Sequence, residues 1–209
     1  MAKKVQKPTD ASTEEKIREA ARKLFTQKGY ASVTTREIAE EAGINLALLN
    51  YYFRSKEKLF LQIMEESMQQ FIQGVVVLFN DENTSMDEKI DKLVSNYIDM
   101  LISYPDLPLF ILSELRSNSN KLAMKLDSQI GLARSTFIRQ IQEAMRAGKI
   151  PEVHIMHIIA NMMAMMVFPF VASPLLKKIG HVNDKQFMEL MQERKKLVPV
   201  WIKAMLKAR

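Results

Sequence analysis

Residues 34–60 read TTREIAEEAGINLALLNYYFRSKEKLF, and this stretch decides how the rest of the sequence is interpreted. Thr34 and Glu37 have the T-x-x-E spacing of a capping box, which predicts that a helix begins at the residue after the threonine. Gly43 supplies the conformational freedom for a tight turn, and the side-chain oxygen of Asn45 can cap a second short helix. The stretch therefore predicts two short helices joined by a turn, with a third helix beginning shortly afterwards.

The second short helix, residues 46–52, has two faces of different chemistry. Ile44, Leu49 and Phe53 fall on one side and are predicted to point inward. The residues on the opposite side are Leu46, Ala47, Asn50 and Tyr51. An exposed face of small, amide and phenolic groups, set between basic residues, suits the major groove of DNA. We therefore expect this helix to read a DNA duplex.

The same stretch resembles the helix-turn-helix of the TetR (tetracycline-repressor-like) family of bacterial transcriptional regulators. The matching features are paired threonines with E-I, the A-G-I turn, Leu49, the aromatic run at residues 51–53 and S-K-E-K-L-F at residues 55–60. The resemblance covers residues 13–60, and the remaining chain matches the family only in length and helical texture. It implies a homodimeric regulator whose palindromic operator is released when a small ligand binds.

We expect base contacts and phosphate contacts to come from different residues. Asn50 is predicted to contact a base edge, because an asparagine amide can bond adenine N6 and N7 together, whereas Leu46 and Ala47 could touch only a thymine methyl or a sugar. The residues expected mainly to hold phosphates are Thr34, Thr35, Arg36, Tyr51, Tyr52 and Lys56. The complete predicted DNA-binding set is Thr34, Thr35, Arg36, Asn45, Leu46, Ala47, Asn50, Tyr51, Tyr52 and Lys56.

Composition agrees with a nucleic-acid partner. The 209 residues carry a net charge of +6, and residues 1–60 contain 12 Lys and Arg against 8 Asp and Glu, a net +4. A basic surface on the part of the chain that carries the motif favours DNA. The sequence has no cysteine, which excludes disulfides and thiolate metal sites. The N-terminus lacks the apolar core of a signal peptide, so we expect a cytoplasmic protein.

Helical periods continue along the whole chain, and no useful length alternates with period two. The sequence predicts an all-α fold of about nine helices, with a helix-turn-helix domain over 1–60 and a helical ligand-binding and dimerisation domain over 61–209. A capping box at Ser12 and Glu15 predicts the start of the first helix, which should end at Gly29. The later helices are expected at roughly 56–79, 86–103, 107–117, 119–146, 152–170 and 183–207.

Residues 153–176 carry no formal charge and are long enough to cross a bilayer. His154, His157 and Asn161 within this stretch argue against insertion, and we expect no membrane association. Together with the last predicted helix, the stretch presents more apolar surface than one unit can easily bury. A symmetric helix-bundle interface between two copies of the chain would cover that surface.

The sequence shows no motif for catalysis, so we expect neither an enzyme nor a cofactor. His154 and His157 lie three residues apart but have no third ligand nearby in the sequence, and no metal site is predicted. The family's pockets lie among the middle helices, here roughly residues 97–170, whose Met, Leu, Ile and Phe favour a small hydrophobic or amphipathic effector. The candidate ligand-binding residues are His157 and Asn161, joined by Tyr97, Phe110 and Arg116. Hydrogen bonding of His157 and Asn161 within a dimer interface is the alternative.

The function predicted from these observations is that of a homodimeric transcriptional regulator, a repressor relieved by the effector. Two other classes stay open at this point. A dimeric helical adaptor would carry the motif without binding duplex DNA at physiological salt. A membrane-associated helical protein would partition into detergent on fractionation.

Overall fold

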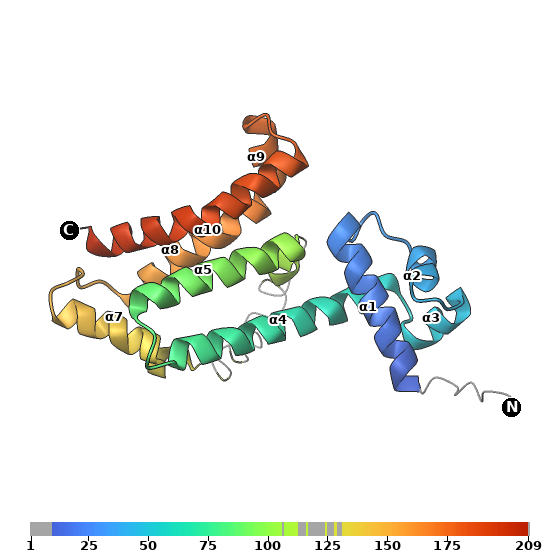
Figure 1. The fold of residues 1–209 in the computed structure, drawn as a ribbon, viewed down its shortest axis with the longest axis horizontal. Coiled ribbons are helices and arrows are strands. Elements are labelled where there is room, and N and C mark those ends of the chain that lie inside the picture. Colours follow the sequence, from blue (N-terminus) through green and yellow to red (C-terminus); the bar gives the residue numbers. More distant parts are fainter. Residues whose placement is uncertain are drawn as a thin grey trace, which may run out of the picture. The chain divides into compact units, whose positions relative to one another are not determined.

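The computed structural model describes residues 10–105, 107–112, 116, 124, 128 and 131–208, and the side chains begin at Ser12. The regular elements within these ranges are all helices, with no strand among them (Figure 1), which confirms the all-α prediction. Two compact units divide the chain, residues 1–67 and residues 68–209. The division falls inside one continuous helix, α4 (Lys56–Asn80), as does the domain boundary expected after residue 60.

The first unit contains three helices before α4: α1 (Asp10–Lys28), α2 (Thr35–Glu41) and α3 (Leu46–Tyr52). Its core is formed by apolar side chains that recur at helical spacing, so burial of the apolar faces of these helices stabilises the unit. The fully buried members are Ile17, Ala21, Ile38, Leu49, Leu59 and Ile63. The rings of Phe25 and Phe60 meet edge to face at 5.3 Å, joining α1 to α4 within this unit.

The start of α1 differs from the prediction. The helix begins at Asp10, so Ser12 lies in its first turn and does not form the predicted capping box with Glu15. Glu15 instead accepts a hydrogen bond from Arg18 at 2.6 Å, one turn further along the helix. The salt bridge therefore takes the carboxylate that the sequence assigned to the cap. The other end agrees with the prediction, since Gly29 follows the last helical residue with a φ of +75°.

The second unit is built around α5, which packs against α8 and α10 (Figure 1). The elements after α4 are α5 (Met86–Ser103), a 3₁₀ turn η1 (Leu132–Arg134), α7 (Thr136–Arg146), α8 (Ile155–Val171), α9 (Ser173–Ile179) and α10 (Asp184–Lys207). Ile90, Val94, Ile98 and Leu101 are spaced along one side of α5 and are fully buried. This apolar stripe is the reason that α5 lies at the centre of the unit.

The helices of this unit differ from the prediction in two places. The helix expected over 119–146 is broken at Gly131, which has a φ of +54°, and α7 begins afresh with Ser135 as its cap. The sequence predicts no helix between residues 170 and 183, but α9 forms there with Pro174 in its first turn. A proline is tolerated there because the first backbone N–H groups of a helix have no partner within the helix. The described part of the helix expected over 107–117 is helical at residues 107–112 and 116, and the rest lies outside the described residues.

A buried lysine fastens α4 to α5. Lys89 is fully buried, and its ammonium donates hydrogen bonds to the backbone carbonyls of Asp81 and Thr84 in the connecting loop. Burial lowers the pKa of Lys89 from its usual value. The loop carbonyls replace the water that a buried ammonium would lose, so the connection is held from inside the unit.

The helices α8 and α9 contain the uncharged stretch, residues 153–176, whose length would allow it to cross a bilayer. Among the described residues, no single helix is both long and apolar enough to cross a membrane. Only α8 and α9 taken together meet the requirements of length and composition, and they are bent by 72° at the break between them.

Candidate DNA-binding surface

The start of α2 is fixed by the predicted capping box. The backbone N–H of Glu37 donates to the Thr34 hydroxyl at 3.2 Å, and the backbone N–H of Thr34 donates to the Glu37 carboxylate at 2.8 Å. Lys28, in the last turn of α1, donates to the same carboxylate at 2.8 Å. The ammonium of Lys28 and the two groups of Thr34 together lower the pKa of Glu37 to about 2. The cap therefore also joins the end of α1 to the start of α2.

The turn between α2 and α3 also forms as expected. Gly43 has a φ of +67°, which a residue with a side chain rarely adopts. The side-chain oxygen of Asn45 accepts a hydrogen bond from the backbone N–H of Leu48 at 2.8 Å and so caps α3. This cap occupies the oxygen of Asn45, and the residue is exposed.

The two faces of α3 differ as the sequence predicts. Leu49 and Phe53 are buried in the first unit, and Ile44 is half-buried. Asn50 and Tyr51 lie on the exposed face, and 78% of the Tyr51 side chain is accessible to solvent. The exposed face of α3 therefore carries an amide and a phenol, as the sequence predicts.

The other residues of the predicted set lie at different depths. Thr34, Arg36 and Ala47 are exposed, whereas Thr35, Leu46 and Tyr52 are half-buried. The ring of Tyr52 meets the Tyr51 ring edge to face at 5.3 Å. The structure adds two cations that the sequence reading did not select, Arg54 and Lys58, both exposed beside the end of α3. Their signal in the sequence is their position, Arg54 directly before the S-K-E-K run and Lys58 at its end.

The ammonium of Lys56 makes contacts within the first unit that the sequence does not predict. It donates to the carbonyl oxygens of Tyr30 at 2.9 Å and Val33 at 2.8 Å, and it lies 4.2 Å from the centre of the Tyr30 ring. These bonds use two of the three donors of the ammonium and hold the loop between α1 and α2. Lys56 thus supports the first unit in addition to any contact with a phosphate.

A charged cluster joins α1 to the first half of α4. Glu66 accepts a hydrogen bond from Arg22 at 2.9 Å, lies 3.8 Å from Arg18 and accepts another from Gln62 at 3.3 Å. These groups are part-buried, and the carboxylate serves two guanidinium groups of the same helix. The cluster therefore ties α4 to α1, the helix that packs against α2 in the first unit.

The structure places the five residues predicted for the ligand site at different depths. Tyr97 is buried on α5, its ring meets Phe71 edge to face at 4.8 Å, and burial raises its pKa to about 12. Phe110 is half-buried and Arg116 is exposed. His157 and Asn161 both lie on the exposed side of α8.

The neighbours of Asn161 and His157 are side chains at the ends of α10 and α8. The amide nitrogen of Asn161 lies 3.1 Å from the sulfur of Met205 on α10. The His157 ring lies 6.5 Å from the ring of His154, which caps α8 with its Nδ1. Among the described residues, no group of three or more His, Asp or Glu is placed to hold a metal ion.

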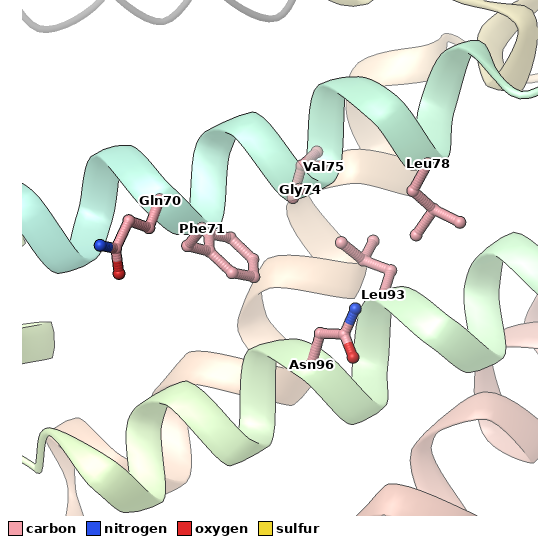
Figure 2. Close-up of a pocket in the computed structure, with 7 residues that line it drawn as sticks. All are labelled: Gln70, Phe71, Gly74, Val75, Leu78, Leu93 and Asn96. Carbon is pink, nitrogen blue, oxygen red and sulfur yellow. The ribbon is translucent and has the colours of Figure 1, made fainter.

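A cavity lies between α4 and α5, where residues of both helices face one another (Figure 2). Its volume is about 200 Å³. The lining residues are Gln70, Phe71, Gly74, Val75, Leu78, Leu93 and Asn96. The cavity belongs wholly to the second unit, and the sequence reading selected none of its residues.

A capped short helix, a glycine turn, and a second capped helix with an exposed amide and phenol define a helix-turn-helix DNA-binding protein. Residues 17–63 match the family model of bacterial regulatory proteins, tetR family. Residues 17–63 therefore form a helix-turn-helix domain of the TetR family of bacterial transcriptional regulators.

Curated relatives that extend beyond this domain agree with this assignment. The probable HTH-type transcriptional regulator YttP of Bacillus subtilis is 22% identical over 94% of this chain and 95% of its own length. The fatty acid metabolism regulator protein of Bacillus subtilis is 24% identical over 65% of this chain and 70% of its own. The crystal structure of a TetR family transcription regulator from Marinobacter aquaeolei VT8 has the same fold, with a TM-score of 0.54, 16% identity, and coverage of 96% of this chain and 98% of that one.

Proposed function

We propose that the protein is a homodimeric repressor that binds a palindromic operator and leaves it when a small hydrophobic or amphipathic molecule binds. The observation that carries the proposal is the exposed face of α3, where the Asn50 amide and the Tyr51 ring are accessible while Leu49 behind them is buried. We assign DNA binding to residues 1–60, and effector binding and dimerisation to residues 61–209. Since its target is bacterial DNA, we place the protein in the cytoplasm.

Dimerisation is supported by the apolar side chains that α8 and α10 leave exposed. Phe168 on α8 is 59% exposed, and Val200 and Trp201 on α10 are 61% and 42% exposed. Contiguous apolar surface on a monomer marks an interaction site, and two copies related by a two-fold axis could cover it with a four-helix bundle. Two reading heads about 34–36 Å apart would then fit successive major grooves.

Release by an effector is supported by the continuity of α4. The helix begins beside α3, is tied to α1 through Glu66, and continues into the second unit as far as Asn80. A ligand that binds one head separation better than the other shifts the equilibrium by that difference in affinity. A relative named as a fatty acid metabolism regulator supports an apolar effector.

The experiment that tests DNA binding is selection from a library of random duplexes at about 0.15 M salt. We expect a palindromic sequence to be enriched by the wild type. No enrichment would leave a helical adaptor as the better explanation.

The effector is tested by a thermal-shift screen of apolar and cationic compounds. Ligands that stabilise the wild type but not His157→Ala or Asn161→Ala would place those two residues in the site. Equal stabilisation of all three proteins would give them a structural role, in keeping with their exposed positions on α8.

A further inference from the structure

Methionine is the only sulfur-containing residue of this protein, whose sequence has 15 methionines and no cysteine. A thiol switch is therefore impossible, and an oxidant that reacts with sulfur can act only on thioethers. One helix of the second unit, α8, is especially rich in them. Its methionines are Met156, Met162, Met163, Met165 and Met166.

The methionines of α8 lie on different sides of the helix. Met156 and Met163 are two helical turns apart, and they are 56% and 41% exposed. Met162 and Met166 are one turn apart and are buried in the core of the second unit. The same helix therefore presents one pair of thioethers to solvent and a second pair to the core, which gives the exposed pair a matched comparison.

The exposed pair belongs to the apolar surface that we assigned to dimerisation. Met156 and Met163 share the exposed side of α8 with Ala160, which lies between them, and with Phe168. A thioether fits such a surface as a flexible apolar group, whereas a sulfoxide is polar. An interface that covered a sulfoxide without donating a hydrogen bond to it would lose free energy. Oxidation of this pair should therefore weaken association.

We propose that Met156 and Met163 are oxidation sites through which a peroxide dissociates the protein and lowers its affinity for the operator. The sulfur lone pair attacks one peroxide oxygen, so that an S–O bond forms as the O–O bond breaks. The second oxygen takes the proton of the first and leaves as water. Sulfur thus loses two electrons and becomes a sulfoxide, and the peroxide gains them.

The proposal rests on the dimerisation in the proposed function, whereas the reactivity of the two sulfurs does not. Because an interface on this face would cover both sulfurs, the free chain is the form that reacts. Sulfoxides formed on the free chain would hinder it from pairing again, so mass action would draw the dimer apart.

The first measurement follows sulfoxide formation in the full chain under hydrogen peroxide, by tandem mass spectrometry of its peptides. In protein dilute enough to sediment as a monomer, Met156 and Met163 should react about tenfold or more faster than Met162 and Met166. In concentrated, dimeric protein the exposed pair should react several-fold more slowly, whereas Met124, which is 73% exposed outside α8, should keep its rate. Rates at the exposed pair that equal those of the buried pair, or that ignore concentration, would overturn the proposal.

The second measurement is sedimentation velocity after the peroxide has been removed. Oxidation should raise the dissociation constant of the wild-type dimer about tenfold or more, and the two stereospecific methionine sulfoxide reductases should restore it. The double variant Met156→Leu/Met163→Leu keeps the apolar volume but has no sulfur at either position, so its dimer should survive peroxide. Met124→Leu, the matched control, should stay sensitive. A double variant that dissociates on oxidation as the wild type does would contradict the assignment.

Operator affinity is measured separately, by the anisotropy of a labelled selected duplex before and after oxidation. A loss of affinity in the wild type that the double variant does not show supports the proposal. A wild type that is monomeric before any peroxide is added refutes dimerisation, and the oxidation sites with it. A wild-type dimer that persists with sulfoxides at both Met156 and Met163 refutes the oxidation sites alone, so the two failures are distinguishable.

Discussion

A single amide, that of Asn50, has the exposure and the hydrogen-bonding groups needed to read a base edge from α3. We expect Asn50→Ala to lose about 1–3 kcal/mol of binding free energy on the selected operator and to relax the preference at one base pair. Asn83→Ala, an exposed asparagine in the α4–α5 loop, is the matched control. An anisotropy titration that finds unchanged affinity and preference would remove Asn50 from the reading face.

Lys56 is expected to have two roles. Lys56→Ala should weaken specific and non-specific duplexes about equally and reduce the salt slope by about one. Because its ammonium also holds the carbonyls of Tyr30 and Val33, the substitution should lower the melting temperature of the first unit. Lys58→Ala removes an exposed lysine two residues further along α4, and it should reduce the salt slope without the loss of stability. A loss confined to the specific operator would make Lys56 a reader of sequence.

The carboxylate of Glu37 gives the first unit a pH dependence of known sign. Its pKa is lowered from 4.5 to about 2 in the folded protein, so its stabilising effect is complete above pH 4.5 and is lost as the pH falls toward 2. We expect Glu37→Gln to unfold more easily than the wild type at pH 7, and the difference to disappear toward pH 2. Thermal unfolding at several pH values measures it, with Glu40→Gln as an exposed control on the same helix. A difference that grows with acidity would contradict the assignment.

At the scale of single elements, local signals predicted the caps and turn around α2 and α3 and the bounds of α5 and α10, but they missed the break at Gly131 and the start of α1. The caps at Thr34 and Asn45 and the turn at Gly43 could be predicted because each depends on residues within one helical turn. The break at Gly131 was missed because an isolated glycine inside a helical pattern is often tolerated, and only its φ reveals the turn. The bonds of Lys56 to Tyr30 and Val33 join residues more than twenty positions apart, which no local pattern records.

The candidate site residues also differ in whether a local pattern in the sequence could predict them. The exposed face of α3 follows from helical periodicity and the family resemblance, so Asn50 and Tyr51 could be selected from the sequence. The cavity beside Gly74 depends on how α4 and α5 face one another, which the sequence does not specify. His157 and Asn161 share a face of α8, as their spacing predicts, but that face is exposed.

The connection between α4 and α5 offers a test of stability at this scale. Lys89→Met keeps much of the side-chain volume but leaves the carbonyls of Asp81 and Thr84 without their donor. We expect a loss of about 1–3 kcal/mol in the free energy of unfolding, because buried acceptors lose their partner. Urea denaturation measures it, and Lys92→Met, an exposed lysine on the same helix, should stay within about 0.5 kcal/mol of the wild type. An unchanged midpoint for Lys89→Met would show that the buried bonds contribute nothing net.

For the whole molecule, the exposed side chains of α8 and α10 predict self-association. Val200→Asp places a charge in the proposed interface and should convert the dimer to a monomer that remains folded, because Val200 is already exposed in the single chain. Val77→Asp, at a position 73% exposed on α4, should stay dimeric. Sedimentation velocity and circular dichroism separate loss of the dimer from loss of the fold. A wild type that sediments as a monomer would refute the interface.

The most direct measurement is the affinity of the wild type for three duplexes at about 0.15 M salt: the selected palindrome, the same palindrome with about five base pairs inserted between its half-sites, and a scrambled duplex. Two heads that read successive major grooves on one side of the DNA should bind the palindrome about a thousandfold or more tighter than the scrambled duplex. The insertion turns one half-site to the opposite side of the helix and should remove most of that preference. Equal affinity for all three duplexes would contradict a dimer that reads DNA through α3.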